Sequence, residues 1–159
     1  MKQKLLVVFL LLTSLSIYSQ GGEADLPISW SYDFDGTFTP IKLPSIDFSS
    51  IAAQDSINDL DKSLPWRYGI EIPITIDLKN NGEQIVLPNG DKLWRIAFTS
   101  TNAVNLSLNF SKFYLPIGSR MQMYGGDKND LSRIYTNDDN RESRKTGSWF
   151  IDDDEIWVE

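Results

Sequence analysis

The chain contains no histidine and no cysteine in its 159 residues. The two absences exclude the serine triad, cysteine nucleophiles and zinc sites built from these side chains. They also exclude a disulfide framework, although a chain of this length can bury a core without cross-links. The lack of disulfides therefore says nothing about the cellular compartment. We expect this chain to have no enzymatic activity of its own.

Basic residues and long apolar runs are also scarce. Lys and Arg number 15 against 22 Asp and Glu, so the formal charge is −7. An acidic chain without a basic stripe is a poor partner for nucleic acid or anionic lipid, because both require clustered Lys and Arg. The apolar run from Leu5 to Leu12 is too short to span a bilayer stably.

Residues 1–19 have the order of a secretory signal peptide. Lys2 and Lys4 precede the apolar run, and small and polar residues follow it, which favours cleavage between Ser19 and Gln20. We therefore expect a protein exported through the periplasm to the cell surface or medium, with no retained membrane span. A retained anchor is the alternative. Cleavage removes both lysines and leaves a charge of −9.

Residues 20–64 are rich in Pro, Ser and Asp, with scattered aromatic residues and no sustained period. This composition indicates an extended lead-in segment. The piece "SSIAAQDSINDLDK" has the spacing of a short helix that Ser50 can cap, although its apolar face is thin.

Short alternating runs begin after Pro65. Strict alternation from Ile70 to Leu78 predicts a strand with one buried face, in which Pro73 suggests an edge or a bulge. A turn follows in which we expect Gly82 to supply a positive φ. Further runs are "EQIVL", "KLWRIAFTS", "NLSLNF", "SRMQMY", "SRIY", "SWFI" and "EIWVE".

This spacing predicts an all-β fold for residues 65–159, an antiparallel β-sandwich of jelly-roll type, preceded by the lead-in and an N-terminal signal helix. A barrel is the alternative. A parallel α/β fold is excluded because no series of helices is present to connect parallel strands.

Acidic residues in the predicted turns are weak candidates for a calcium site, because carboxylate oxygens are the ligands calcium prefers. Hydrated turns that keep the protein soluble are the simpler interpretation, so we expect no obligatory cofactor. A hydrolase using acids alone would need two carboxylates facing each other across a cleft. The candidate calcium ligands are Asp127, Asp130, Asp138, Asp139, Asp152, Asp153 and Asp154.

Tryptophans offer a second kind of candidate site. Trp66, Trp94, Trp149 and Trp157 could stack on sugar rings, although the alternation in "KLWRIAF" places Trp94 on an apolar face. Arg95 could bind an anion, but an ion pair with one of the loop acids is the preferred interpretation.

Four stretches in fixed order resemble the N-terminal region of secreted bacterial trypsin-like serine proteases of the lysyl endopeptidase type. They are "LPSIDFSSIAAQDS", "LPWRYGIEI", "GDKLWRIAFTSTNAVNLSLNFSKFYLPIGSRMQMY" and "TGSWFIDDDEIWVE". No piece is unique alone, and the order and spacing carry the resemblance. The residues that match the family motifs are Trp94, Arg95, Leu115, Pro116, Gly118, Arg120, Tyr124, Trp149, Asp154 and Glu155.

The resemblance implies a propeptide or accessory domain that assists folding of a protease domain or keeps it inactive. No triad residue can be carried over, because the family's protease domain would follow Glu159. We therefore expect a fragment whose β-domain is incomplete at its C-terminal end, with the cognate protease domain or another extracellular protein as partner. A free-standing surface module that binds carbohydrate or protein is the alternative.

Overall fold

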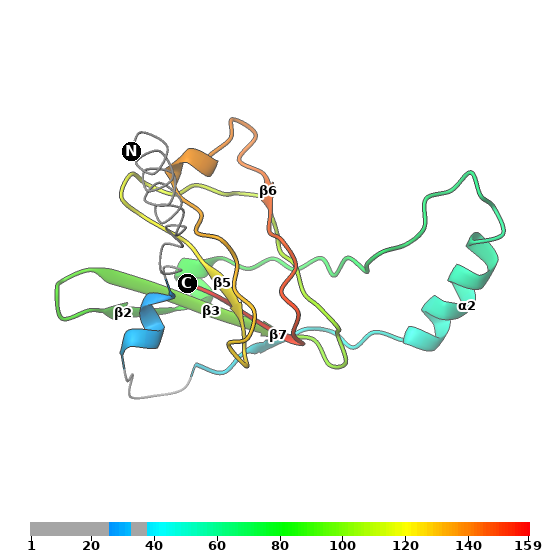
Figure 1. Cartoon of the computed structure of the whole chain (residues 1–159), viewed down its shortest axis with the longest axis horizontal. Coiled ribbons are helices and arrows are strands. Elements are labelled where there is room, and N and C mark those ends of the chain that lie inside the picture. The colour runs from blue at the N-terminus through cyan, green and yellow to red at the C-terminus, as the bar shows by residue number, and fades with distance from the viewer. Residues whose placement is uncertain (1–25, 33–37) are drawn as a thin grey trace, which may run out of the picture.

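The computed structural model of the chain describes residues 26–32 and 38–159. The predicted signal peptide and its cleavage site at Ser19 and Gln20 lie outside the described residues. Figure 1 shows a β-rich body from which a long arm carries one helix, α2, away to one side. Within the described part of the chain, no helix is both long and apolar enough to cross a membrane.

A five-stranded sheet forms the centre of the body (Figure 1). Its longest strand, β3 (Lys92–Thr99), pairs antiparallel with β2 (Glu83–Val86) and β7 (Glu155–Val158), and parallel with β1 (Ile41–Lys42). Strand β5 (Met123–Gly125) pairs antiparallel with the other side of β7. Burial of β3 is continuous from Arg95 to Phe98, as expected for a strand that is covered on both faces.

A smaller two-stranded sheet joins β4 (Asn109–Phe110) and β6 (Thr146–Gly147). The remaining elements are the short helices η1 (Ile28–Ser31), α2 (Phe48–Asn58), α3 (Leu78–Asn81) and η2 (Asn137–Asp139). The core is one apolar cluster made by Ile96, Phe98, Phe113, Met121, Met123, Tyr135, Ile151, Ile156 and Val158.

The β2–β3 hairpin forms as its sequence predicts. Glu83 lies opposite Arg95 and Val86 opposite Lys92, and the turn between them closes with the Leu87 N–H donating to the Asp91 carbonyl at 2.8 Å. Gly90 occupies the left-handed region at φ 90°, where glycine is favoured. Asn89 and Gly90 therefore lie in the turn, where this pair is common in hairpins.

Gly82 is required for a different reason from the one expected. Its φ is −91°, so the predicted positive φ is wrong. A Cβ on Gly82 would lie 2.6 Å from the Leu78 carbonyl oxygen and 2.7 Å from that of Arg95. The close approach of helix α3 and strand β3 therefore excludes a side chain at this position.

The β-rich class is confirmed. The sheet is mixed, because β1 runs parallel to β3. Two parts of the predicted lead-in contact the sheet: Ile41 pairs with Phe98, and the Ser29 hydroxyl lies 3.0 Å from the Tyr124 hydroxyl. The rings of Trp30 and Tyr124 also meet edge to face at 5.3 Å.

The predicted strand from Ile70 to Leu78 is wrong for the single chain. Residues 69–77 form no helix or strand, and Leu78 begins α3. Only Ile76 and Leu78, at the end of the stretch, pack against the core. The alternation is present in the sequence, but no strand of the described chain lies beside this segment to accept it.

The segment from Phe113 to Tyr124 turns at Pro116–Ser119, where the Ser119 N–H donates to the Pro116 carbonyl at 3.0 Å. Gly118 has φ 83°, which relieves the turn. Met121 and Met123 then enter the core on the same side, as their spacing predicts.

Candidate interaction surface

The arm, defined here as residues 44–77, leaves the body after β1 and returns to it at α3. Helix α2 lies at its far end, and two extended connections join this helix to the body (Figure 1). None of the residues in α2 is buried. Helix α2 therefore does not stabilise the body by packing, and Ile76, near the end of the returning connection, is the arm residue that packs against the core cluster.

Helix α2 begins at Phe48 because Asp47 caps it. One Asp47 carboxylate oxygen accepts hydrogen bonds from the N–H groups of Ser49 and Ser50, both at 3.1 Å. The Ser49 hydroxyl and these N–H groups hold the pKa of Asp47 below its ordinary value. The helix prediction is confirmed, but the expected cap, Ser50, lies within the first turn.

Few contacts hold the arm to itself. Arg67 forms an ion pair with Asp55 at 3.2 Å and donates to Gln54 at 3.2 Å, which ties the returning connection to α2. Lys62 lies 5.4 Å from the centre of the Trp66 ring. These exposed interactions each stabilise by a fraction of a kcal/mol to about 1 kcal/mol.

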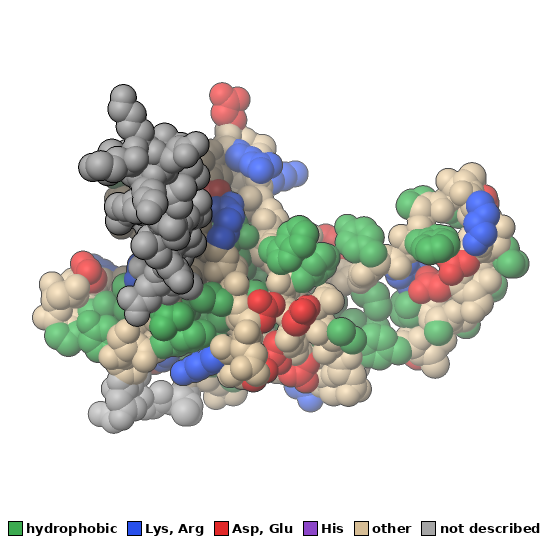
Figure 2. Space-filling model, in the orientation of Figure 1, with side chains coloured by type: hydrophobic (Ala, Val, Ile, Leu, Met, Phe, Trp, Pro, Cys, Tyr) green, Lys and Arg blue, Asp and Glu red, His purple; other side chains and the backbone are tan. Residues whose placement is uncertain are grey.

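Large apolar side chains of the arm face solvent. Tyr68 is 92% exposed, Leu60 82% and Trp66 69%. The set of exposed large apolar residues on the arm is Phe48, Ile57, Leu60, Leu64, Trp66, Tyr68, Ile70 and Ile74. Figure 2 shows such side chains along the arm, next to charged ones. This exposure makes the arm the candidate interaction surface among the described residues.

The arm is also acidic. It contains six acids, namely Asp47, Asp55, Asp59, Asp61, Glu71 and Asp77, and two bases, Lys62 and Arg67. The net charge of the segment is therefore −4. An apolar surface with an acidic border is complementary to a partner that carries basic residues around an apolar patch.

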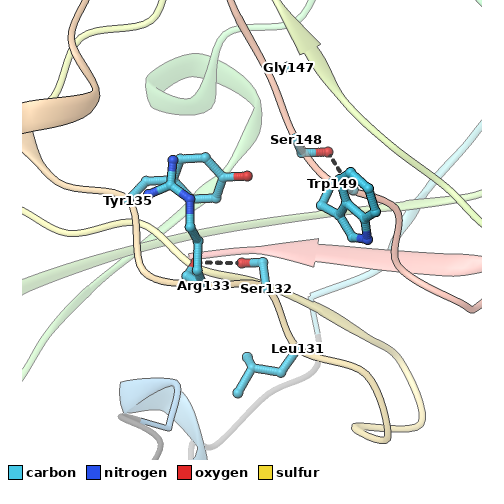
Figure 3. A pocket seen from close by; sticks show the side chains of 7 residues that line it. All are labelled: Leu131, Ser132, Arg133, Tyr135, Gly147, Ser148 and Trp149. Atoms are coloured by element: carbon cyan, nitrogen blue, oxygen red, sulfur yellow. Dashed lines mark hydrogen bonds between the residues drawn. The ribbon is translucent and has the colours of Figure 1, made fainter.

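The body carries an open pocket of about 410 Å³ between the segments 131–135 and 147–149 (Figure 3). Trp149 lies at its rim and is 75% exposed. Arg133 lies over the Tyr135 ring at 4.1 Å and binds both carboxylate oxygens of Asp139, at 2.5 and 3.0 Å. The hydrogen bonds that Arg133 donates to Asp139 raise the pKa of Arg133 above its ordinary value.

The polar groups in the pocket already have partners within the chain. The Ser132 hydroxyl donates to the Arg133 carbonyl at 2.8 Å, and the Ser148 hydroxyl donates to the Trp149 carbonyl at 2.7 Å. Both serine oxygens also accept backbone N–H groups at 2.8 Å, from Met123 and Leu108 respectively. The pocket therefore offers an aromatic rim and few free polar groups.

The four tryptophans proposed as a sugar-stacking face do not form one surface. Trp66 lies on the arm and Trp149 at the pocket, whereas Trp94 and Trp157 are half-buried in the sheet. The rings of Trp157 and Tyr124 are stacked, with their centres 6.2 Å apart and an angle of 1° between their planes. Phe38 contacts the Trp157 ring edge to face. Trp157 is therefore half-buried between Tyr124 and Phe38.

Arg95 forms the ion pair that the sequence favoured over an anion site. Its guanidinium lies 2.7 Å from Glu83, a residue of the neighbouring strand instead of a loop. It also lies 5.6 Å from the centre of the Trp157 ring. These contacts explain the Trp-Arg pair as packing across strands β2, β3 and β7.

Two acidic turns that are distant in sequence lie together. The Asp127 N–H donates to Asp153 at 3.1 Å, and the Asp152 N–H donates to Asp130 at 2.8 Å. Burial raises the pKa of Asp153, but backbone donors that include Asp127 and Glu155 outweigh burial and hold it below its ordinary value. These carboxylates accept backbone N–H groups and so fasten the turns together.

The other calcium candidates lie in different surroundings. Asp138 and Asp139 belong to η2, where Asp139 caps the helix and binds Arg133, and Asp154 is exposed. Across residues 26–32 and 38–159, no three acids converge in a way that could hold a metal ion. Calcium binding stays a prediction to be tested in solution.

The family-motif residues are dispersed, and most of them support packing. Asn140 holds both backbone groups of Leu115, at 2.9 and 2.8 Å, and Pro116 and Gly118 form the turn described above. The Asp154 carbonyl accepts the Ser100 N–H at 2.9 Å, and Glu155 accepts the Trp157 indole N–H at 2.6 Å. Arg120 is exposed, and Trp149 is the motif residue at the pocket.

Tyr124 lies at the centre of a small cluster of polar side chains beside η1. Its hydroxyl contacts the Ser29 hydroxyl and donates to Glu159 at 3.4 Å. Burial raises the pKa of Tyr124 to about 12. The motif tyrosine thus fastens the N-terminal segment to the end of β7.

No protein-family model matches this chain, and no solved structure matches it significantly. The candidate surface therefore rests on the geometry alone. Sequence reasoning missed the arm, because the alternation after Trp66 was assigned to the body. The available signal was Pro65, which lies between the stretch with helical spacing and the alternation that begins at Trp66.

Proposed function

We propose that this chain is the non-catalytic N-terminal pro- or accessory domain of a secreted trypsin-like serine endopeptidase precursor of the lysyl endopeptidase type. It assists folding of the protease domain or keeps it inactive, and it acts by surface complementarity without chemistry of its own. The ordered motifs from Trp94 to Glu155 support the family, and the absence of histidine and cysteine agrees with a non-catalytic role.

The single observation that carries this proposal is the arm. It exposes large apolar side chains that a free-standing domain would bury, and it has an acidic border. A protease domain with basic residues around an apolar surface would cover those side chains. Burying these side chains removes apolar surface from water, which favours docking against the entropy lost on association.

The first test is the DNA that follows the codon for Glu159. A protease domain with a His, Asp and Ser set, in frame or frameshifted, supports the proposal. Unrelated sequence counts against it. The functional test refolds that protease domain from denaturant with and without this chain and measures cleavage after lysine. Equal recovery of activity, together with no inhibition by added chain, would contradict both versions of the role.

The alternative function is a free-standing surface module that binds carbohydrate or protein. The observation that favours it is the open pocket with exposed Trp149 at its rim. Aromatic rings can stack on the apolar faces of sugars. This function predicts quenching or a shift of tryptophan fluorescence on ligand addition, and loss of that signal in Trp149→Ala.

We also propose the finer architecture, a β-sandwich of jelly-roll type. In its support, the core cluster joins residues of the five-stranded sheet, such as Ile96 and Ile156, to Phe110 of the small sheet. Export and cleavage after Ser19 belong to the same proposal. N-terminal sequencing of the secreted protein tests them, and a first residue other than Gln20 would contradict the cleavage site.

A further inference from the structure

The returning connection of the arm has the sequence of a β-strand over its whole length. From Trp66 to Leu78 every even position is apolar, and the odd positions hold Arg, Gly, Glu, Pro, Thr and Asp. The even residues are Trp66, Tyr68, Ile70, Ile72, Ile74, Ile76 and Leu78. Such strict alternation over thirteen positions is typical of a strand with one apolar face.

The backbone of this strand-like sequence is unpaired. From residue 65 to residue 76 no backbone N–H or C=O makes a hydrogen bond to any described residue. Asp77, which follows, has extended dihedral angles, φ −121° and ψ 126°. Ile70 and Ile74 are 38% and 42% exposed. The segment therefore combines the sequence of a strand, partly exposed isoleucines and unpaired backbone groups, which is the combination that pairs with a further strand.

Pro73 determines which edge can pair. In an extended strand the N–H and C=O groups of alternate residues point to the same edge. The odd edge contains Pro73, which lacks an N–H donor, whereas Ile70, Ile72, Ile74 and Ile76 give the even edge a complete set. If only the even edge pairs, two strands form a dimer and no third strand can add to the odd edge.

Opposite charges favour one register of an antiparallel pair made from two copies. Centring the pair on residue 71 places Glu71 opposite itself, and centring it on residue 74 places Glu71 opposite Asp77. Both registers are disfavoured, because like charges lie directly opposite each other. Centring on residue 72 instead places Arg67 opposite Asp77 on both sides of the axis.

We propose that residues 67–77 form a symmetric antiparallel β-ribbon with a second copy of this chain, with Ile72 on the two-fold axis. Ile70 then pairs with Ile74 of the second copy, and Pro73 falls at a non-hydrogen-bonded position opposite Glu71. Isoleucines from both copies form one apolar face. Such an interface is self-complementary, which is the requirement for a closed dimer. It does not depend on the proposed function.

Proline substitution on the two edges tests the ribbon. The unmodified chain is measured by sedimentation equilibrium over a concentration series at physiological salt, together with Ile72→Pro and Thr75→Pro. Neither position donates a backbone hydrogen bond to any residue that the structure describes, so we expect neither change to disturb the body. Ile72→Pro removes two donors at the axis and weakens dimerisation at least about tenfold. Thr75→Pro alters the unused edge and leaves dimerisation unchanged.

Single cysteines test the register, because the natural chain contains none to compete. Under oxidation we expect Ile72→Cys to form a disulfide-linked dimer faster than Glu71→Cys, Pro73→Cys or Ile74→Cys. Strand pairs at the axis have Cα atoms about 5.5 Å apart, which a disulfide accommodates. Ser45→Cys, at an exposed position outside the ribbon, is the control that measures the rate of random cross-linking.

Each outcome decides the matter. A monomer at every concentration, open-ended oligomers, a dimer that survives Ile72→Pro, or equal loss in both proline variants would overturn the ribbon. Cross-linking that is fastest at residue 71, 73 or 74 would overturn the register. None of these experiments involves a protease domain, so their failure is distinct from failure of the proposed function.

Discussion

Arg95 forms an ion pair with Glu83 within the five-stranded sheet. Its side chain is 10% exposed and that of Glu83 31%, and their atoms lie 2.7 Å apart. Removing one member of such a pair leaves the other charge buried without its partner. We expect Glu83→Ala to lower the free energy of unfolding by about 2 kcal/mol, below the cost at a fully buried pair because Glu83 retains water contact.

Denaturant unfolding measures this loss. The matched control is Gln84→Ala, an exposed change in the same strand that should stay within about 0.5 kcal/mol of the unmodified chain. Equal losses in the two variants would show that the ion pair contributes nothing to stability.

Tyr124 makes the stability of the folded chain depend on pH in the alkaline range. Its pKa is raised from 10.0 to about 12 in the folded chain, so between these values the unfolded chain releases the proton that the folded chain retains. Stability is therefore fully present below pH 10 and falls as the pH rises toward 12. We expect Tyr124→Phe to lose about 1 kcal/mol at neutral pH, with the Ser29 hydrogen bond, and to show a smaller alkaline decline.

Melting temperature measured against pH checks the effect of Tyr124. Tyr114→Phe is the control, because Tyr114 is exposed and its loss should leave the alkaline decline as it is. If Tyr124→Phe and Tyr114→Phe decline in parallel, buried Tyr124 is not the group responsible.

Among the elements, helix α2 depends on its cap more than on packing. It buries no residue, and Asp47 satisfies two N–H groups of its first turn. We expect Asp47→Ala to speed hydrogen exchange of the amides from Ile51 to Asp59 and to leave exchange in β3 and β7 unchanged, because the body does not rest on α2. Ser45→Ala is the control, and faster exchange in β3 as well would show that the arm and the body unfold together.

The elements also differ in how far the sequence predicts them. The hairpin of β2 and β3 follows from local signals, because Asn89-Gly90 determines the turn and alternation determines the buried face. Pairing between distant segments does not follow: nothing near Ile41 indicates a parallel partner at Phe98, and nothing near Asp130 indicates Asp152. Such contacts depend on the packing of the whole chain, which local periodicity does not record.

The candidate surface escaped prediction for a related reason. Alternation shows that Ile70 to Ile76 form an apolar face, but it does not say which molecule covers that face. The two methionines were easier to place, because Met121 and Met123 enter the core cluster in step with their spacing. Sequence therefore predicts buried faces better than it predicts their partners.

In the whole molecule, the residues that stabilise the fold and the residues proposed to bind a partner lie in different parts. The body holds the core cluster, whereas the arm holds exposed apolar residues and a net charge of −4. Removing apolar groups from the arm should then affect partners without affecting the fold. Ile57, Leu60 and Leu64 suit this test, because they are exposed and lie outside the ribbon residues.

We expect the triple variant Ile57→Ser, Leu60→Ser and Leu64→Ser to keep the melting temperature within about 2 °C, since exposed substitutions rarely change stability by more than about 0.5 kcal/mol. The same variant should lose most of its effect on refolding or inhibition of the protease domain, because it removes the apolar surface that docks. The matched control, Val86→Ser with Val104→Ser, removes exposed apolar groups from the body and should retain that effect. A lowered melting temperature in the triple variant would show that the arm supports the body, and full activity in it would place the docking surface elsewhere.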